Sequence, residues 1–223
     1  MIELEHIFVS YTKEFNTLQD ISFALNDGDK LVIVGEKDSG RTALLRTIVG
    51  LDKCKSGTIL INGTPIEKIN FKDDVSLGFL PSEPVFIENK SVEDNLKYVL
   101  DIRSKDKKLI NLHVNNALSG YDIANLRDRK LKSLNRLERI KVALARLSLR
   151  PLNIIIIDDI FDMLSDYESE KVIKSIKELI KINSATAIVT VATDAIAKKF
   201  NYNTVHLKYG SIVEYNEQKE VKE

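Results

Sequence analysis

A continuous apolar strand that runs directly into a glycine-bounded loop and a helix is the feature that most constrains this chain. Residues 30–34, Lys-Leu-Val-Ile-Val, form a run typical of a strand buried on both faces of a parallel sheet. The run ends at Gly35, and after Gly40 leucine and isoleucine recur at helical spacing until Gly50. A loop in this setting can surround phosphate groups with its backbone N–H groups and with the helix N-terminus. The sequence therefore predicts a phosphate-binding loop after a buried strand.

The loop matches the phosphate-loop motif G-x-x-x-x-G-K-[ST] at every fixed position except one. Gly35 and Gly40 are the two glycines, and Thr42 supplies the hydroxyl that ligates Mg²⁺ in this motif. Arg41 replaces the lysine, and its planar guanidinium does not reproduce the point contact of a compact ammonium. Taken alone, this imperfect match also allows a purely structural strand-turn-helix. The candidate nucleotide-binding residues of the loop are Gly35, Lys37, Ser39, Gly40, Arg41 and Thr42.

A second buried strand delivers two carboxylates at its carboxyl end. Residues 154–157 are all isoleucine, and Asp158 and Asp159 follow them directly. Ligands of mostly parallel sheets lie at the carboxyl ends of the strands, so Asp158 is a candidate Mg²⁺ ligand together with Thr42. An acidic turn after a buried strand is common by itself. Because it follows a phosphate loop with a long helical segment between the two, nucleotide binding is the preferred interpretation.

The remaining pattern predicts one α/β domain. Residues 1–25 alternate apolar and polar side chains, which predicts an antiparallel β part at the N-terminus. Later strands alternate with helices and predict a mostly parallel sheet. We expect residues 1–84 and 151–223 to form the α/β core, and the charged, helical pattern of residues 85–150 to form an inserted helical lobe.

The composition narrows the classes of partner. The 33 basic and 33 acidic side chains cancel, so no net field draws the chain to nucleic acid or to an anionic membrane. The single cysteine, Cys54, cannot form an internal disulfide, and no leader pattern opens the chain. No apolar run approaches the ~20 residues of a membrane helix. These features predict a cytoplasmic protein that reaches a membrane only through a partner and does not bind nucleic acid.

Further segments, in order along the chain, resemble the ATP-binding cassette (ABC) family of ATPases. Tyr11 stands where the family has an adenine-stacking aromatic residue. The resemblance continues through the phosphate loop and residues 56–63 (SGTILING). Residues 78–84 (GFLPSEP) resemble the family's Q-loop region, residues 142–146 (VALAR) the helix after its signature sequence, and residues 208–213 (KYGSIV) its closing hairpin. The chain is therefore similar to an ABC nucleotide-binding domain over nearly its whole length.

This resemblance implies a P-loop NTPase (RecA-like) core, with ATP and Mg²⁺ as cofactors. Tyr11 would contact the adenine, Asp158 the metal, and Ser82 stands at the glutamine that senses the γ-phosphate. Asp159 takes the place of the catalytic glutamate. The family also implies a separate transmembrane, permease-like partner and a second cassette, as a homo- or heterodimer that encloses ATP between its two members. Such a subunit would be peripheral, on the cytoplasmic face of a membrane.

The departures from the family pattern fall on residues that carry the chemistry. Asp38 occupies a position that is usually glycine, and Thr193 stands at the switch histidine, for which none of the chain's three histidines substitutes by position. Residues 134–138 (LNRLE) replace the L-S-G-G-Q signature and lack both glycines. The side chain of Asp159 is one methylene shorter than that of the expected glutamate. Together with Arg41 and Ser82, these changes predict weak or absent ATP hydrolysis, because phosphoryl transfer depends on positioned charge.

Two functions from different classes remain open at this point. The first is an ABC-type ATP-binding subunit of a membrane transporter, with degenerate catalytic motifs. The second is a non-hydrolysing pseudo-ATPase adaptor or scaffold of a membrane complex, such as a cell-division or envelope-maintenance assembly. A soluble ABC protein acting on translation or DNA is less favoured, because the chain has no second cassette, no long coiled-coil insertion and no basic stripe.

Overall fold

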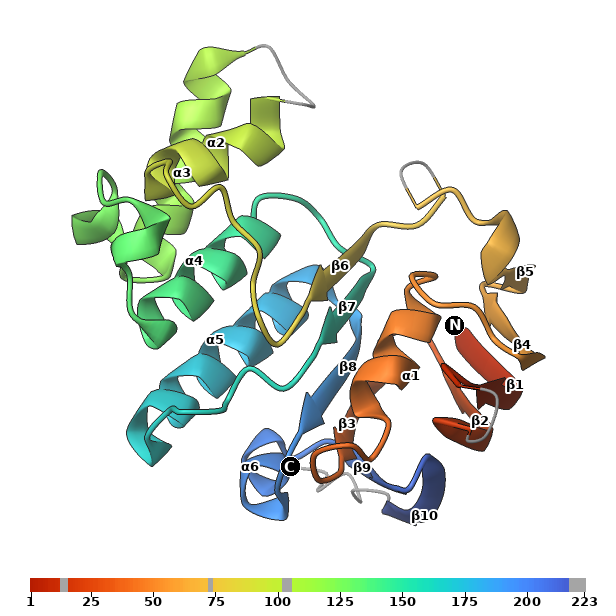
Figure 1. The fold of residues 1–223 in the computed structure, drawn as a ribbon. Helices are drawn as coiled ribbons and strands as arrows, with labels where there is room; N and C mark the ends of the chain where they lie inside the picture. Colours follow the sequence, from red (N-terminus) through yellow and green to blue (C-terminus); the bar gives the residue numbers. More distant parts are fainter. Residues whose placement is uncertain (13–15, 72–73, 102–105, 217–223) are drawn as a thin grey trace, which may run out of the picture. The chain divides into compact units, whose positions relative to one another are not determined.

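The computed structural model describes residues 1–12, 16–71, 74–101 and 106–216. It divides the chain into two compact units (Figure 1). The first unit contains Met1–Phe79, Leu152–Asp159 and Ile180–Glu223, and the second contains Leu80–Pro151 and Ile160–Leu179. The chain therefore leaves the first unit twice and returns to it each time.

A four-stranded antiparallel sheet opens the first unit. Its strand order is β2-β1-β4-β5. The strands are β1 (Ile2–Val9), β2 (Leu18–Leu25), β4 (Ser56–Ile61) and β5 (Thr64–Pro65). Buried and exposed side chains alternate along much of β1, as expected when only one face of a sheet is buried. The predicted antiparallel β part at the N-terminus is confirmed.

The second sheet is mostly parallel and has the order β10-β9-β3-β8-β7-β6. Strand β3 pairs in parallel with β8 and β9, β7 pairs in parallel with β8, and β10 is antiparallel to β9. Every residue of β7 and β8 is buried, which explains their continuous apolar sequences. The strands are β3 (Lys30–Val34), β6 (Leu77–Leu80), β7 (Ile154–Ile157), β8 (Thr186–Val191), β9 (Asn203–Lys208) and β10 (Ser211–Asn216).

Two α-helices lie wholly in the first unit. Helix α1 (Arg41–Ile48) buries Leu44, Leu45 and Ile48 in the core cluster that also contains residues of both sheets. Helix α6 (Asp194–Phe200) was not predicted, because seven residues hold too few apolar positions to reveal a helical period. A short 3₁₀ helix, η1 (Ile66–Lys68), follows β5.

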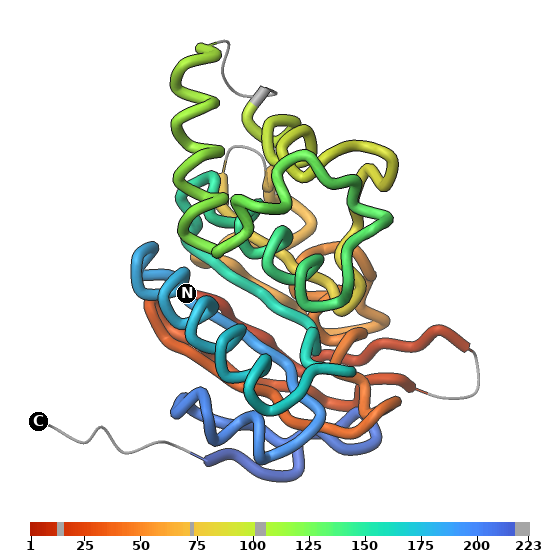
Figure 2. The backbone as a smooth tube through the Cα atoms, turned by 90° about the vertical axis from the view of Figure 1, so that its left-hand side faces the viewer, coloured from red at the N-terminus to blue at the C-terminus, as the bar shows by residue number. Residues whose placement is uncertain are grey.

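The second unit is helical, as Figure 2 shows for the yellow to green part of the chain. Its α-helices are α2 (Val92–Asp101), α3 (Lys107–Gly120) and α4 (Arg136–Leu147), and its 3₁₀ helices are η2 (Ala124–Leu126) and η3 (Leu131–Ser133). Helix α5 (Asp166–Asn183) begins in this unit and ends in the first. In the described part of the chain, no helix has both the length and the apolar character needed to cross a bilayer.

Candidate functional site

The loop between β3 and α1 needs glycine at both of its motif positions. Gly40 is the N-cap of α1, and its φ of 103° lies in the left-handed region. A Cβ atom at Gly40 would lie 2.9 Å from the carbonyl oxygen of Thr17. A Cβ atom at Gly35 would collide with Ser39 Oγ and lie 2.6 Å from the carbonyl oxygen of Leu207. The two glycines therefore allow a close-packed backbone loop.

Asp38 has a backbone conformation that favours glycine. Its φ is 64°, again in the left-handed region, and aspartate is among the few non-glycine residues that tolerate it. Its side chain places an exposed carboxylate next to the loop.

The start of α1 offers hydrogen-bond donors to an anion. No side chain caps this helix, and Leu44 N–H donates to the carbonyl oxygen of Gly40 at 2.9 Å as the first turn closes. The amide groups before Leu44 are those that an α-helix leaves without an internal acceptor. Ser39 Oγ is buried and has no partner among the described residues. Phosphate oxygens accept hydrogen bonds from both kinds of donor, so the loop fits a phosphate group.

A pocket of about 500 Å³ lies beside this loop, within the first unit. Tyr11 and Thr17 line it together with residues 36–43, so Lys37, Ser39, Gly40, Arg41 and Thr42 all border one space. Gly35 instead lines a second pocket, of about 490 Å³, to which Lys37 and Ser39 also belong.

Tyr11 is fixed through its hydroxyl, although its side chain is exposed. The phenol donates to Asp52 Oδ2, and the guanidinium of Arg46 holds both oxygens of the same carboxylate, at 2.8 and 2.9 Å. Partial burial and the hydrogen bond to Asp52 raise the pKa of Tyr11 to about 12. The hydrogen bond from Arg46 lowers the pKa of Asp52. The aromatic ring thus has a defined place at the pocket.

Asp158 and Thr42, the candidate metal ligands, lie in direct contact. Thr42 Oγ1 donates to Asp158 Oδ2 at 2.9 Å, and Thr190 Oγ1 donates to Asp158 Oδ1 at 2.7 Å. Asp158 is buried, and each of its two carboxylate oxygens accepts a hydrogen bond from one of these hydroxyl groups. Within the described residues, no group of three or more His, Cys, Asp or Glu side chains could hold a metal ion. Mg²⁺ commonly binds one or two protein ligands together with substrate phosphates, which this pair of side chains fits.

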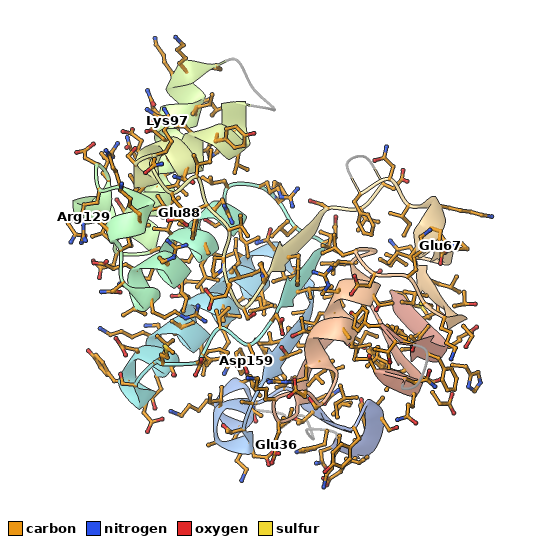
Figure 3. The ribbon with its side chains drawn as sticks, viewed as in Figure 1. Glu36, Glu67, Glu88, Lys97, Arg129 and Asp159 are labelled. Carbon is orange, nitrogen blue, oxygen red and sulfur yellow. The ribbon has the colours of Figure 1, made fainter. Side chains whose placement is uncertain are left out.

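Arg41 and Asp159 neutralise each other. The guanidinium Nη1 lies 2.8 Å from Asp159 Oδ2, and the two side chains are only 11% and 17% exposed. Figure 3 labels Asp159 beside α1, the helix that begins with Arg41. Arg41, at the motif's lysine position, and Asp159, at the expected catalytic position, therefore form one partly buried ion pair.

The second pocket contains a histidine for which the sequence indicated no role. His206 lies on β9 and lines this pocket with Thr193 and Asp194. Its Nε2 lies 2.7 Å from Asp194 Oδ1, and its Nδ1 lies 3.6 Å from Glu214 Oε2. His206 and Thr190 could not be found from the sequence, because each meets the site through the pairing of strands and belongs to no motif.

Ser82 and the segment that replaces the signature belong to the second unit. Asn135 caps α4 in a capping box with Glu138, so the segment without glycines is a regular helix start. Arg136 Nη2 donates to the carbonyl oxygen of Ser82 at 2.9 Å, and its Nη1 pairs with Glu83 at 2.8 Å. The structure thus joins these two expected sites to each other.

Comparison with known families agrees with this architecture. The family model described as ABC transporter matches residues 18–162, more than half of the chain. The chain belongs to the ABC transporter family. The match spans the phosphate loop, the helical insertion and the Asp158–Asp159 turn of this ABC protein, and the predicted family and α/β fold are confirmed.

Among its ABC relatives is the molybdate/tungstate import ATP-binding protein WtpC of Pyrococcus horikoshii, at 30% identity over 84% of this chain and 54% of the relative. The phosphonates import ATP-binding protein PhnC of Fusobacterium nucleatum is 28% identical, over 100% of this chain and 95% of the relative. This ABC chain spans about half the length of several relatives that it matches, including WtpC. The structure of CbiO1 from Clostridium perfringens, part of the ABC transporter complex CbiONQ, is similar to this chain with a TM-score of 0.86 at 22% identity. The match covers 99% of this chain and 89% of the CbiO1 chain.

Proposed function

We propose that this chain is an ATP-binding subunit of an ABC transporter complex that binds ATP with Mg²⁺ and hydrolyses it weakly or not at all. The names of its relatives support ATP binding and transport. The observation that carries the reduced hydrolysis is the 2.8 Å ion pair between Arg41 and Asp159.

Binding of the nucleotide would use the residues that border the 500 Å³ pocket. The N–H groups at the start of α1 and the Ser39 hydroxyl would hold phosphate oxygens, and the exposed Lys37 would add a positive charge. Tyr11 offers an aromatic face to the base. Thr42 and Asp158 would hold Mg²⁺, which when bound supplies charge that neutralises the phosphates.

Hydrolysis requires charge that faces the reacting phosphate and a group that orients water. Arg41 and Asp159 satisfy each other, so each must break the ion pair before it can act on the nucleotide. Positioning errors of about 1 Å can lower a rate on the order of a hundredfold. The hydroxyl side chains of Ser82 and Thr193 are too short to reproduce the reach of the glutamine and histidine that the family resemblance implies at these positions. Binding is therefore better supported than turnover.

The proposed partners follow from the same family. We place the subunit beside a separate permease-like membrane protein and a second cassette, on the cytoplasmic face of the membrane. A cassette with weakened catalytic residues is most useful next to an intact one, so we favour a heterodimer. The relatives WtpC and PhnC are named as import proteins for different anions, and the transported substrate of this chain is therefore not assigned.

Calorimetric titration with ATP and Mg²⁺ tests this proposal on the native protein and on Arg41→Lys. We expect the native protein to bind ATP with a micromolar Kd. We also expect its rate of ATP hydrolysis, measured as release of inorganic phosphate, to lie well below the ~1 s⁻¹ at the low end of ordinary enzymes. Arg41→Lys should bind ATP more tightly, because a compact ammonium can reach the phosphates. Arg129→Lys, in an ion pair with Glu138 of the second unit, is the matched control and should bind ATP as the native protein does.

Three outcomes separate the alternatives. Turnover of the native protein within the ordinary range would contradict weak hydrolysis. Binding only after Arg41→Lys would place the defect in the Arg41–Asp159 pair. No binding by either protein would contradict the proposal and favour the non-hydrolysing scaffold.

A further inference from the structure

Two segments that are far apart in the sequence, the β9–β10 turn and the start of β2, meet beside the phosphate loop. The Tyr209–Gly210 turn joins β9 to β10, and Gly210 N–H donates to the carbonyl oxygen of Ser39 at 2.9 Å. Gln19 N–H in turn donates to the carbonyl oxygen of Gly210 at 2.8 Å. The side chain of Gln19 donates to the carbonyl oxygen of Tyr209 at 3.1 Å. The turn is therefore fixed to β2 on one side and to the loop on the other.

The hydrogen bond from Gly210 sets the direction of one N–H group in the loop. The described chain contains no cis peptide bond, so the Ser39–Gly40 peptide is trans and planar. In a trans peptide the carbonyl and the following N–H point in opposite directions. Because the Ser39 carbonyl points to Gly210, the Gly40 N–H points away from the turn. Gly40 lines the 500 Å³ pocket, whereas residues 206–209 and Val213 of the hairpin line the other pocket.

Two features of position 210 favour glycine over any residue with a Cβ atom. Its φ is 76°, in the left-handed region. A Cβ atom there would also collide with the carbonyl oxygen of Thr17 and lie 3.2 Å from the Cα atom of Leu18. Any larger residue must therefore move the turn away from β2, and the hydrogen bond to Ser39 moves with it.

We propose that Gly210 is a positioning residue for phosphate binding: the Tyr209–Gly210 turn holds the Ser39 carbonyl so that the Gly40 N–H faces the bound phosphate. This inference rests on the proposed function and deepens it. Part of the affinity for phosphate then depends on the β9–β10 hairpin, which lies more than 150 residues after the loop in the sequence.

The chain contains a matched control for the glycine substitution. Asn62 and Gly63 form the turn of the β4–β5 hairpin, with φ values of 52° and 73°. Tyr209 and Gly210 have nearly the same values, 49° and 76°. Both turns therefore have positive φ at two successive residues, as in the turns favoured by two-residue hairpins. A Cβ atom at Gly63 would meet nothing within 4 Å. Gly63→Ala thus imposes the same backbone conformation on alanine without the collision.

Titration of Gly210→Ala and Gly63→Ala with ATP and Mg²⁺ tests the inference. We expect Gly210→Ala to weaken binding by roughly tenfold or more, the scale of one hydrogen bond to a charged group. We expect Gly63→Ala to bind like the native protein. Inorganic tripolyphosphate should lose affinity by the same factor, because the effect lies at the phosphates and the base makes no contribution to it.

A second measurement needs no nucleotide. Amide hydrogen exchange followed by NMR should show protection of the Gly210 N–H in the native protein, and the Gly40 amide signal should shift in Gly210→Ala only. If Gly210→Ala does not fold, Gln19→Met removes the side-chain hydrogen bond to Tyr209 and should produce the same shift and loss of affinity to a smaller extent.

The outcomes separate this inference from the proposed function. If the native protein does not bind ATP, the proposed function is wrong, and the exchange experiment still decides whether Gly210 orients the loop. Equal effects of both glycine substitutions on the Gly40 signal would overturn the inference. So would native ATP affinity and a native Gly40 signal in a folded Gly210→Ala protein.

Discussion

Thr190 shows how one residue outside any motif can orient the carboxylates of a site. It lies on β8 and is fully buried. Its hydroxyl donates to Asp158 Oδ1 at 2.7 Å and accepts the Asp159 N–H at 2.9 Å. One side chain thus fixes the candidate metal ligand and the residue that pairs with Arg41. A buried hydroxyl with two such partners stabilises both the fold and the orientation of the carboxylates.

The first prediction concerns this hydroxyl. Thr190→Val keeps the shape of the side chain but leaves an oxygen of a buried carboxylate without its donor. We expect the free energy of unfolding to fall by about 1–3 kcal/mol, as measured by urea denaturation. Thr190→Ser keeps the hydroxyl and loses only a methyl group. A loss for valine no larger than that for serine would show that the hydrogen bonds contribute little.

The second prediction concerns Tyr11 and alkaline pH. Its pKa is raised to about 12, from an ordinary value of about 10, so the unfolded chain releases this proton at lower pH than the folded chain. The stabilisation is therefore complete below about pH 10 and is lost as the pH rises through about 12. In Tyr11→Phe, the decline of stability across this interval should be shallower than in the native protein. Denaturant midpoints at several pH values measure this, with Tyr98→Phe, on α2 of the second unit, as control.

Among the elements, α4 shows how side chains build a helix start in the segment where the family resemblance led us to expect a glycine-containing signature. Asn135 accepts a hydrogen bond from Glu138 N–H at 2.9 Å, and Glu138 Oε2 accepts one from Asn135 N–H at 2.9 Å. This reciprocal cap satisfies two backbone donors at a helix terminus. In this segment two backbone N–H groups instead donate to side chains of the segment itself. The reciprocal cap therefore stabilises the start of this helix.

Substitution of the cap should therefore affect the second unit. Asn135→Ala should lower the free energy of unfolding by about 1 kcal/mol, because the Glu138 N–H loses its acceptor. Asn135→Ser, which can still cap, should retain most of the stability. Thermal unfolding monitored by circular dichroism compares the two variants, and equal melting temperatures would contradict the assigned cap.

The same elements show which parts of the structure the sequence could reveal. Strand β7 is apolar throughout, β3 is apolar after Lys30, and the glycine-bounded loop has a motif, so these elements and the fold class could be predicted. Helix α6 was missed because it is short. The contacts of the site could not be predicted, because Arg41 and Asp159 are 118 residues apart and only sheet order brings them together. The same holds for Thr190 and for Gly210.

On the scale of the whole molecule, nucleotide binding should raise the free energy of unfolding. A ligand that binds only the folded chain, at a concentration 100 times its Kd, adds about 2.7 kcal/mol to the free energy of unfolding. For a chain of this size, ATP with Mg²⁺ should therefore raise the melting temperature by roughly 5–10 °C. Mg²⁺ alone should leave it unchanged, because the described residues offer no metal site without phosphate. An equal rise with Mg²⁺ alone would contradict this arrangement of the site.

The Arg41–Asp159 pair also limits how this sequence can diverge. Loss of the arginine alone leaves a carboxylate that is only 17% exposed without its counter-ion, and loss of the aspartate alone leaves an unpaired guanidinium. Removing one member of such a pair is strongly destabilising, whereas exchanging both for well-packed neutral residues is often tolerated. In descendants of this chain, substitutions that remove the charge at positions 41 and 159 should therefore occur together. Exchanges that keep the charge at each position, such as Arg41→Lys, escape this constraint, so charge should be lost from both positions or from neither.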